Sequence, residues 1–169
     1  PKLLNFSSMS ALRSASATSL RILSVTAAGR PCGAAMAFQP VIDGHVLTHR
    51  PIDLVAAGAG SHIDLLTGTN SDEYLLFTFL DNRPRSRDEF VARLNRVGLD
   101  ESHLDRFADD SDNYKGATDR LMTELVFRGP ADELLTAHGG RAFDYEFTFK
   151  SAAAGGALGA CHALELPFV

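Results

Sequence analysis

The 169-residue sequence has no tryptophan, only two cysteines and no long apolar run. Cys32 and Cys161 are too few for a disulfide framework or a zinc knuckle. They could form a single bridge, but we expect two free thiols in a reducing compartment, which favours the cytoplasm. No segment approaches the roughly 20 apolar residues of a membrane-spanning helix, and residues 1–6 lack the pattern of a signal peptide. The sequence therefore predicts no association with a membrane.

Positive charge is also scarce. There are 16 Lys and Arg residues and 21 Asp and Glu residues, so the formal net charge is -5. Domains that bind nucleic acid usually present a basic surface, and we therefore expect no nucleic-acid partner. The rest of the composition, 45% hydrophobic and 22% charged, is typical of a globular domain.

The pattern of apolar residues predicts helices interspersed with two strands. The expected helices are 10–27, 51–57, 86–98, 100–108, 117–127 and 131–138, and the expected strands are 63–68 and 142–149. Gly129-Pro130 is expected to kink or break the chain between the last two helices. In helix 117–127, we expect Leu121, Met122, Leu125 and Val126 to face the core.

Strand 142–149 alternates between aromatic and polar residues. Phe143, Tyr145, Phe147 and Phe149 share one face, which we interpret as core. A platform for stacking nucleic-acid bases is not expected, because no basic residues are interleaved with them. The order of elements predicts an α/β fold, namely half of a sheet with helices on its faces. Because two strands do not form a stable sheet alone, a partner segment is expected to be missing.

The two ends of the sequence also suggest a segment of a longer chain. Position 1 is proline, and the sequence ends in Leu166-Pro167-Phe168-Val169, an apolar, strand-like run without a polar tail. The alternative is a processed N-terminus followed, at the other end, by a C-terminal strand that pairs in a sheet.

Two residues able to carry chemistry follow the predicted strands. Glu73 comes just after strand 63–68, and His162 lies on the loop after strand 142–149. Catalytic side chains of open α/β sheets lie beyond the C-terminal ends of strands, and hydrolase triads of this class place the acid before the histidine. From spacing alone, a structural histidine and a solvated glutamate remain open alternatives.

The same two segments resemble the acid and histidine motifs of the type-B carboxylesterases, which include para-nitrobenzyl esterases and cholinesterases. The motifs read LLTGTNSDE, ending at Glu73, and GACHALELPFV, from Gly159 to Val169. Further similarity occurs in family order at 38–44, 118–120, 127–131 and 134–138. The resemblance thus covers 38–169 and implies the C-terminal part of an α/β-hydrolase fold. Residues 1–37 are expected to form a helical lead-in and linker.

The resemblance implies that Glu73, rather than its neighbour Asp72, is the triad carboxylate and that His162 is the general base, with a structural role for Glu165. The implied reaction is hydrolysis of a small-molecule carboxylic ester through a serine acyl-enzyme, without a cofactor. No serine here lies in a G-x-S-x-G elbow. We therefore expect the N-terminal half of the same domain to supply the serine, and this chain alone to be inactive. A non-catalytic cholinesterase-like binding or adhesion module, or a vestigial fragment, is the alternative.

Other chemical signals are weak. His45 and His49 have a spacing that suits zinc on a helix, but Asp43-Gly44 and Pro51 around them predict a non-helical segment, so no metal site is expected. Cys161 adjoins His162, but neighbouring side chains on an extended segment point to opposite faces, which argues against a thiol nucleophile.

Overall fold

A computed structural model describes residues 40–78, 86–108 and 113–168. The chain divides into two units, residues 1–41 and 42–169, and the described elements belong to the second. The predicted helix 10–27 and the linker up to residue 37 lie outside the described residues, so the proposed domain boundary stays a prediction. Within the described ranges, no helix is long and apolar enough to cross a lipid bilayer.

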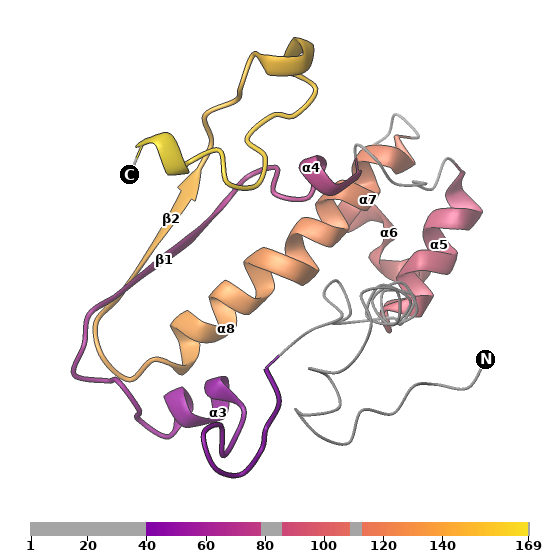
Figure 1. The fold of residues 1–169 in the computed structure, drawn as a ribbon. Helices are drawn as coiled ribbons and strands as arrows, with labels where there is room; N and C mark the ends of the chain where they lie inside the picture. Colours follow the sequence, from indigo (N-terminus) through magenta and orange to yellow (C-terminus); the bar gives the residue numbers. More distant parts are fainter. Residues whose placement is uncertain (1–39, 79–85, 109–112, 169) are drawn as a thin grey trace, which may run out of the picture. The chain divides into compact units, whose positions relative to one another are not determined.

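The described sheet consists of two parallel strands, β1 (Leu65–Asn70) and β2 (Ala142–Phe147), shown side by side in Figure 1. The strands pair from Leu65 with Ala142 to Asn70 with Phe147. β1 begins two residues later than predicted, because the N–H of Ile63 is held in a turn by the carbonyl of Gly60 at 2.9 Å. Parallel strands end at the same edge of a sheet, so the segments that follow β1 and β2 emerge together.

One long helical segment packs against the sheet. It runs through α7 (Tyr114–Thr123), the π-helical turn η2 (Glu124–Arg128) and α8 (Gly129–Ala137) as one ribbon in Figure 1. α7 begins three residues earlier than predicted, because Asn113 caps it by accepting a hydrogen bond from the N–H of Gly116.

The expected break at Gly129-Pro130 is wrong, because the helical segment continues through it by way of the π-helical turn. The N–H of Gly129 donates to the carbonyl of Glu124 across the π-helical turn, and Pro130 lies in the first turn of α8, where a missing N–H is tolerated. The wide turn also changes which side chains face inward. Leu121 is fully buried as predicted, whereas Leu125 is 39% exposed.

The hydrophobic core lies among the helices rather than on the sheet. α5 (Arg87–Arg96) begins at the predicted capping box between Ser86 and Glu89. The 3₁₀ turn η1 (Glu101–His103) and α6 (Leu104–Phe107) follow, with Asp100 as the predicted cap. These helices pack on α7 and form the core. Its buried members are Phe90, Leu94, Phe107, Tyr114, Ala117 and Leu121.

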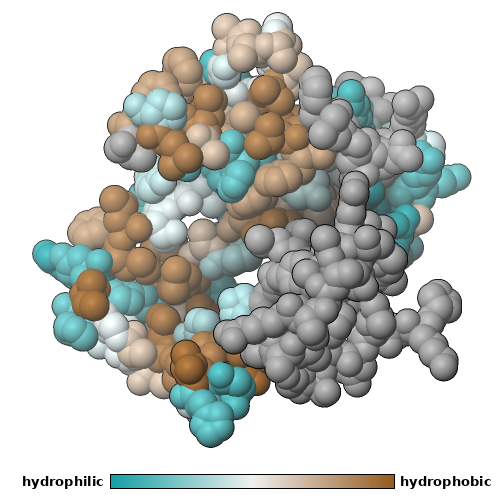
Figure 2. Space-filling model, viewed as in Figure 1, coloured by the Kyte–Doolittle hydropathy of each residue, from teal (hydrophilic) through white to brown (hydrophobic). Residues whose placement is uncertain are grey.

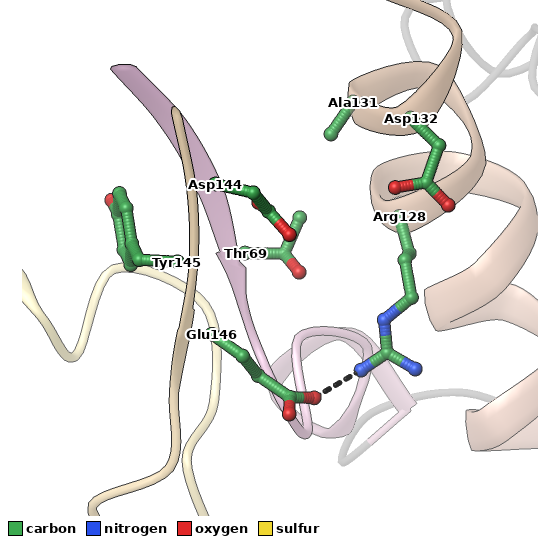
Figure 3. Close-up of a pocket in the computed structure, with 7 residues that line it drawn as sticks. All are labelled: Thr69, Arg128, Ala131, Asp132, Asp144, Tyr145 and Glu146. Atoms are coloured by element: carbon green, nitrogen blue, oxygen red, sulfur yellow. Dashed lines mark hydrogen bonds and ion pairs between the residues drawn. The ribbon is translucent and has the colours of Figure 1, made fainter. Parts of the chain in front are cut away.

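The sheet faces differ from the prediction. On β2, Asp144 and Glu146 point towards the helical segment η2–α8 (Figure 3). Phe143 and Tyr145 lie on the opposite face and are 53% and 40% exposed. The interpretation of the aromatic face as core is therefore wrong for this chain, because the helix covers the polar side of the strand. Figure 2 shows apolar side chains at the surface along the strand pair.

Two short helices flank the strands. α3 (Pro51–Ala56) begins at Pro51 as predicted and packs against α8. Residues 45–49 before it are not helical, as predicted; instead the carboxylate of Asp43 accepts hydrogen bonds from the N–H groups of residues 45–47. α4 (Leu75–Thr78) forms within the apolar stretch after Glu73.

The C-terminal segment returns towards the end of β1. β2 ends at Phe147, two residues earlier than predicted. The expected flexible loop at 152–159 contains a 3₁₀ turn, η3 (Ala153–Gly156). The run from Leu166 that was expected to be strand-like forms another 3₁₀ turn, η4 (Leu166–Phe168). The ring of Phe168 contacts those of Phe147 and Phe149.

Candidate active site

The turn after β1 holds Glu73 in a buried position. Its side chain folds back on the strand, so that Oε1 accepts a hydrogen bond from the N–H of Asn70 at 2.9 Å. Glu73 is only 6% exposed. A carboxylate at this depth requires hydrogen-bond donors to compensate for the lost water, and the strand end supplies one of them.

The second donor is His162. Its Nδ1 lies 2.7 Å from Oε2 of Glu73, and its backbone N–H donates to the carbonyl of Glu73 at 3.3 Å. Because an ionised carboxylate only accepts hydrogen bonds, the proton lies on Nδ1 of the imidazole. Nε2 has no hydrogen-bond partner among the described residues, and 43% of the side chain is exposed. The structure thus joins the two predicted site residues and leaves one ring nitrogen available as a proton acceptor.

The neighbouring acid, Asp72, has a different partner. Its Oδ2 accepts a hydrogen bond from the N–H of Ala160 at 3.0 Å, and its own N–H donates to the carbonyl of Ala160 at 3.1 Å. Gly159 beside them must be glycine, because its φ is +53° and a Cβ would lie 2.5 Å from Oδ2 of Asp72. Asp72 therefore fastens the histidine loop to the turn, and Glu73 is the acid that contacts His162.

Sequence reasoning missed Asn70, which was expected to lie in the loop after strand 63–68 and instead ends β1. Asn70 is 1% exposed, and its Nδ2 donates to the carbonyl of Cys161 at 2.7 Å and to Oε2 of Glu165 at 2.6 Å. Its place inside the TNSDE motif was the signal that could have identified it. Glu165, for which a structural role was expected, accepts one of these hydrogen bonds.

Sequence reasoning also missed two aromatic rings that flank the imidazole. The ring centroids of Phe77 and Phe127 lie 5.3 and 5.1 Å from that of His162. The two phenyl rings are themselves stacked, with centroids 6.1 Å apart and planes at 22°. The imidazole that donates to Glu73 is therefore bordered by the apolar surface of two phenyl rings.

Cys161 is buried and forms no disulfide. Burial raises the pKa of its thiol, so the thiolate is disfavoured at neutral pH. As predicted for adjacent residues, Cys161 faces inward while His162 is exposed.

A cavity of about 180 Å³ lies elsewhere, between the sheet and the helical segment η2–α8. Its polar lining includes Arg128, Asp132, Asp144 and Glu146, and Figure 3 shows the ion pair between Arg128 and Glu146. Neither Glu73 nor His162 lines it. The cavity is therefore a polar gap beneath the helix and not the space beside the imidazole.

Comparisons with known proteins agree on one family. The sequence model of the carboxylesterase family matches residues 5–169. Para-nitrobenzyl esterase of Bacillus subtilis (strain 168) is 34% identical over 136 residues, which cover 78% of this chain and 27% of that protein. The crystal protein of Dictyostelium discoideum is 26% identical over 150 residues, covering 78% and 26%.

Solved structures give the same result. A PNB esterase structure matches with a TM-score of 0.59 and 32% identity, covering 78% of this chain and 27% of that one. The carboxylesterase EST55 of Geobacillus stearothermophilus matches with a TM-score of 0.63 and 34% identity, covering 80% and 29%. The chain thus spans little more than a quarter of the length of these relatives.

Proposed function

This chain belongs to the carboxylesterase family and has a partial α/β-hydrolase fold, and on that premise we propose that its full-length parent hydrolyses small-molecule carboxylic esters. Glu73 and His162 serve as the acid and base of a serine triad. The observation that carries the proposal is the 2.7 Å hydrogen bond between the buried carboxylate and Nδ1, which leaves Nε2 unpaired among the described residues.

The geometry fits the chemistry of acyl transfer. Nε2 of His162 takes the proton of a serine hydroxyl as its oxygen attacks the ester carbonyl, and Glu73 stabilises the imidazolium that forms. The imidazolium then protonates the departing alcohol, which leaves an acyl-enzyme. Water attacks the acyl group in the second half, with His162 again taking and returning the proton, and the acid is released.

The serine would come from the N-terminal half of the same domain. Two observations favour a missing half. The chain spans little more than a quarter of its relatives, and the aromatic face with Phe143 and Tyr145 is exposed. A two-stranded sheet is marginal on its own. A partner segment that covers this face would complete both the sheet and the triad, so the 169-residue chain alone is inactive.

Aryl-ester hydrolysis tests the proposal. The parent protein is expected to turn over a simple aryl ester, and His162→Ala is expected to lower kcat by about 10³-fold or more. His138→Ala is the matched control, because the ring of His138 contacts the carbonyl of Ile63 rather than the site, and it should retain activity. A parent without turnover, or full activity in His162→Ala, would contradict the proposal and favour the non-catalytic alternative.

A further inference from the structure

The π-helical turn η2 lies beside the imidazole of His162. Its residue Phe127 places a ring 5.1 Å from the imidazole, centroid to centroid, with the planes at 44°. π-helical turns are rare in proteins and are found frequently at functional sites. The turn η2 places Phe127 in contact with the imidazole of His162.

The local sequence favours the wide turn. The N–H of Gly129 reaches back five residues to the carbonyl of Glu124. A Cβ at Gly129 would lie 3.0 Å from that oxygen, so glycine allows the close approach. Pro130 has no N–H and cannot donate the bond to Val126 that a regular α-helix would need. Gly129-Pro130 thus favours a π-helical turn in the five residues before it, which include Phe127.

The turn is fastened to both segments that carry the candidate site. Arg128 pairs with Glu124 at 2.7 Å within the helix and with Glu146 on β2, the strand that leads to the histidine loop. On the other side, the N–H of Tyr74, next to Glu73, donates to Oγ1 of Thr123 at 3.2 Å. Phe127 is therefore fixed relative to the strand before His162 and to the turn that carries Glu73.

We propose that Phe127, presented by the π-helical turn, is a positioning residue for His162. Its ring restricts rotation of the imidazole about the Cβ–Cγ bond, which keeps Nδ1 on Glu73 and Nε2 directed away from the carboxylate. Phe77 stacks on Phe127 and also contacts the imidazole at 5.3 Å between centroids, so it supports the ring of Phe127 from beside His162. The consequence for catalysis rests on the proposed function, whereas the restriction of the ring does not.

The first test measures how firmly the imidazole ring of His162 is held. In the full-length parent labelled with ¹⁵N-histidine, the Nδ1 proton of His162 should give a persistent downfield NMR signal. We expect Phe127→Leu to speed its exchange with water about tenfold or to abolish the signal, and Phe127→Tyr to retain it because the ring is kept. Phe149→Leu is the control, since the ring of Phe149 contacts those of Phe147 and Phe168, whereas the rings of Phe77 and Phe127 contact that of His162. A wild-type signal in folded Phe127→Leu would overturn the proposal.

The second test separates positioning from binding. Phe127→Leu should lower kcat on an aryl ester about tenfold while KM stays within about twofold, and Phe127→Tyr should restore kcat to within about twofold of wild type. Unchanged kcat, or a change in KM alone, would contradict a positioning role. If the wild-type parent hydrolyses no ester, the proposed function fails, but the NMR comparison still decides whether Phe127 holds the ring.

Discussion

Asn70 and Cys161 are joined by a buried hydrogen bond, in which Nδ2 of Asn70 donates to the carbonyl of Cys161 at 2.7 Å. The backbone N–H of the same asparagine holds the carboxylate of Glu73. One residue at the end of β1 therefore contacts the acid directly and the histidine loop one residue before His162. Asn70 is the structural link between the two halves of the candidate pair.

We predict that Asn70→Ala destabilises the full-length parent by about 1–3 kcal/mol, because the carbonyl of Cys161 and the carboxylate of Glu165 lose a buried donor. Urea denaturation measures the free energy of unfolding. Asn95→Ala on the exposed side of α5 is the control and should change it by less than about 0.5 kcal/mol. Equal stability of Asn70→Ala and wild type would show that the link is dispensable.

The two neighbouring acids should differ in their effect on catalysis. In the parent protein, we expect Glu73→Gln to lower kcat on the order of 10³- to 10⁴-fold, since the amide cannot stabilise the imidazolium. Asp72→Asn should lower it less than about tenfold, because the remaining side-chain oxygen still accepts from the N–H of Ala160. Steady-state kinetics on one ester compare the pair. A larger loss of kcat in Asp72→Asn than in Glu73→Gln would mean that Asp72, and not Glu73, is the triad acid.

The buried thiol of Cys161 should make stability fall at alkaline pH. Burial raises the pKa of the thiol in the folded state, so the neutral form contributes stability that is complete below the ordinary thiol pKa of about 8.5. That contribution is lost as the pH rises through the higher folded-state value.

Denaturation of the parent protein between pH 7 and 10 measures the effect. In a Cys32→Ser background, the difference in unfolding free energy between Cys161 and Cys161→Ala proteins should shrink towards high pH. Iodoacetamide should also label Cys161 more slowly in the folded protein than in urea. A constant difference across the range would mean that the folded protein does not alter the titration of this thiol.

Local rules predicted the helix starts well. Ser86 with Glu89, Asp100 and Pro51 each act within four residues of themselves, so the sequence is sufficient to place α5, η1 and α3. The same rules failed at Gly129-Pro130. Glycine and proline predict the end of a helix, but here the helix continues through a π-helical turn. That turn is held by an ion pair between Arg128 and Glu146, which lies 18 residues away in the sequence.

The residues of the candidate site also divide into those that the sequence identifies and those that only the structure reveals. Resemblance identified Glu73 and His162, and the structure joins them, although their catalytic roles stay a prediction. Asn70 and Phe127 contribute through contacts with residues far along the chain. No pattern in its own neighbourhood marks Phe127, whereas Asn70 lies inside the TNSDE motif, which does not by itself reveal its distant partners. The burial of the β2 aromatic face could not be judged from alternation alone, because alternation gives the faces of a strand but not which face a helix covers.

The exposed aromatic face should behave differently in this chain and in the parent. If the missing half covers it, Phe143→Thr should destabilise the parent by about 2–4 kcal/mol through loss of buried apolar contact. In the 169-residue chain, where Phe143 is 53% exposed, the change should be below about 0.5 kcal/mol.

Denaturation of both proteins provides the comparison. Val46→Thr is the control, because Val46 is almost fully exposed, and it should alter neither protein appreciably. An equally small effect of Phe143→Thr in the parent would mean that nothing covers this face.

Glu73 and His162 are 89 positions apart in the sequence, yet the pairing of β1 with β2 and the hydrogen bonds of Asn70 and Asp72 to the histidine loop bring them together. Most of the residues between them belong to helices, and α5 and α6 pack on α7. The number of residues between Glu73 and His162 therefore does not determine the distance between their side chains. We therefore expect that residues added or removed at the exposed turn around Gly98 would leave the same two side chains in contact.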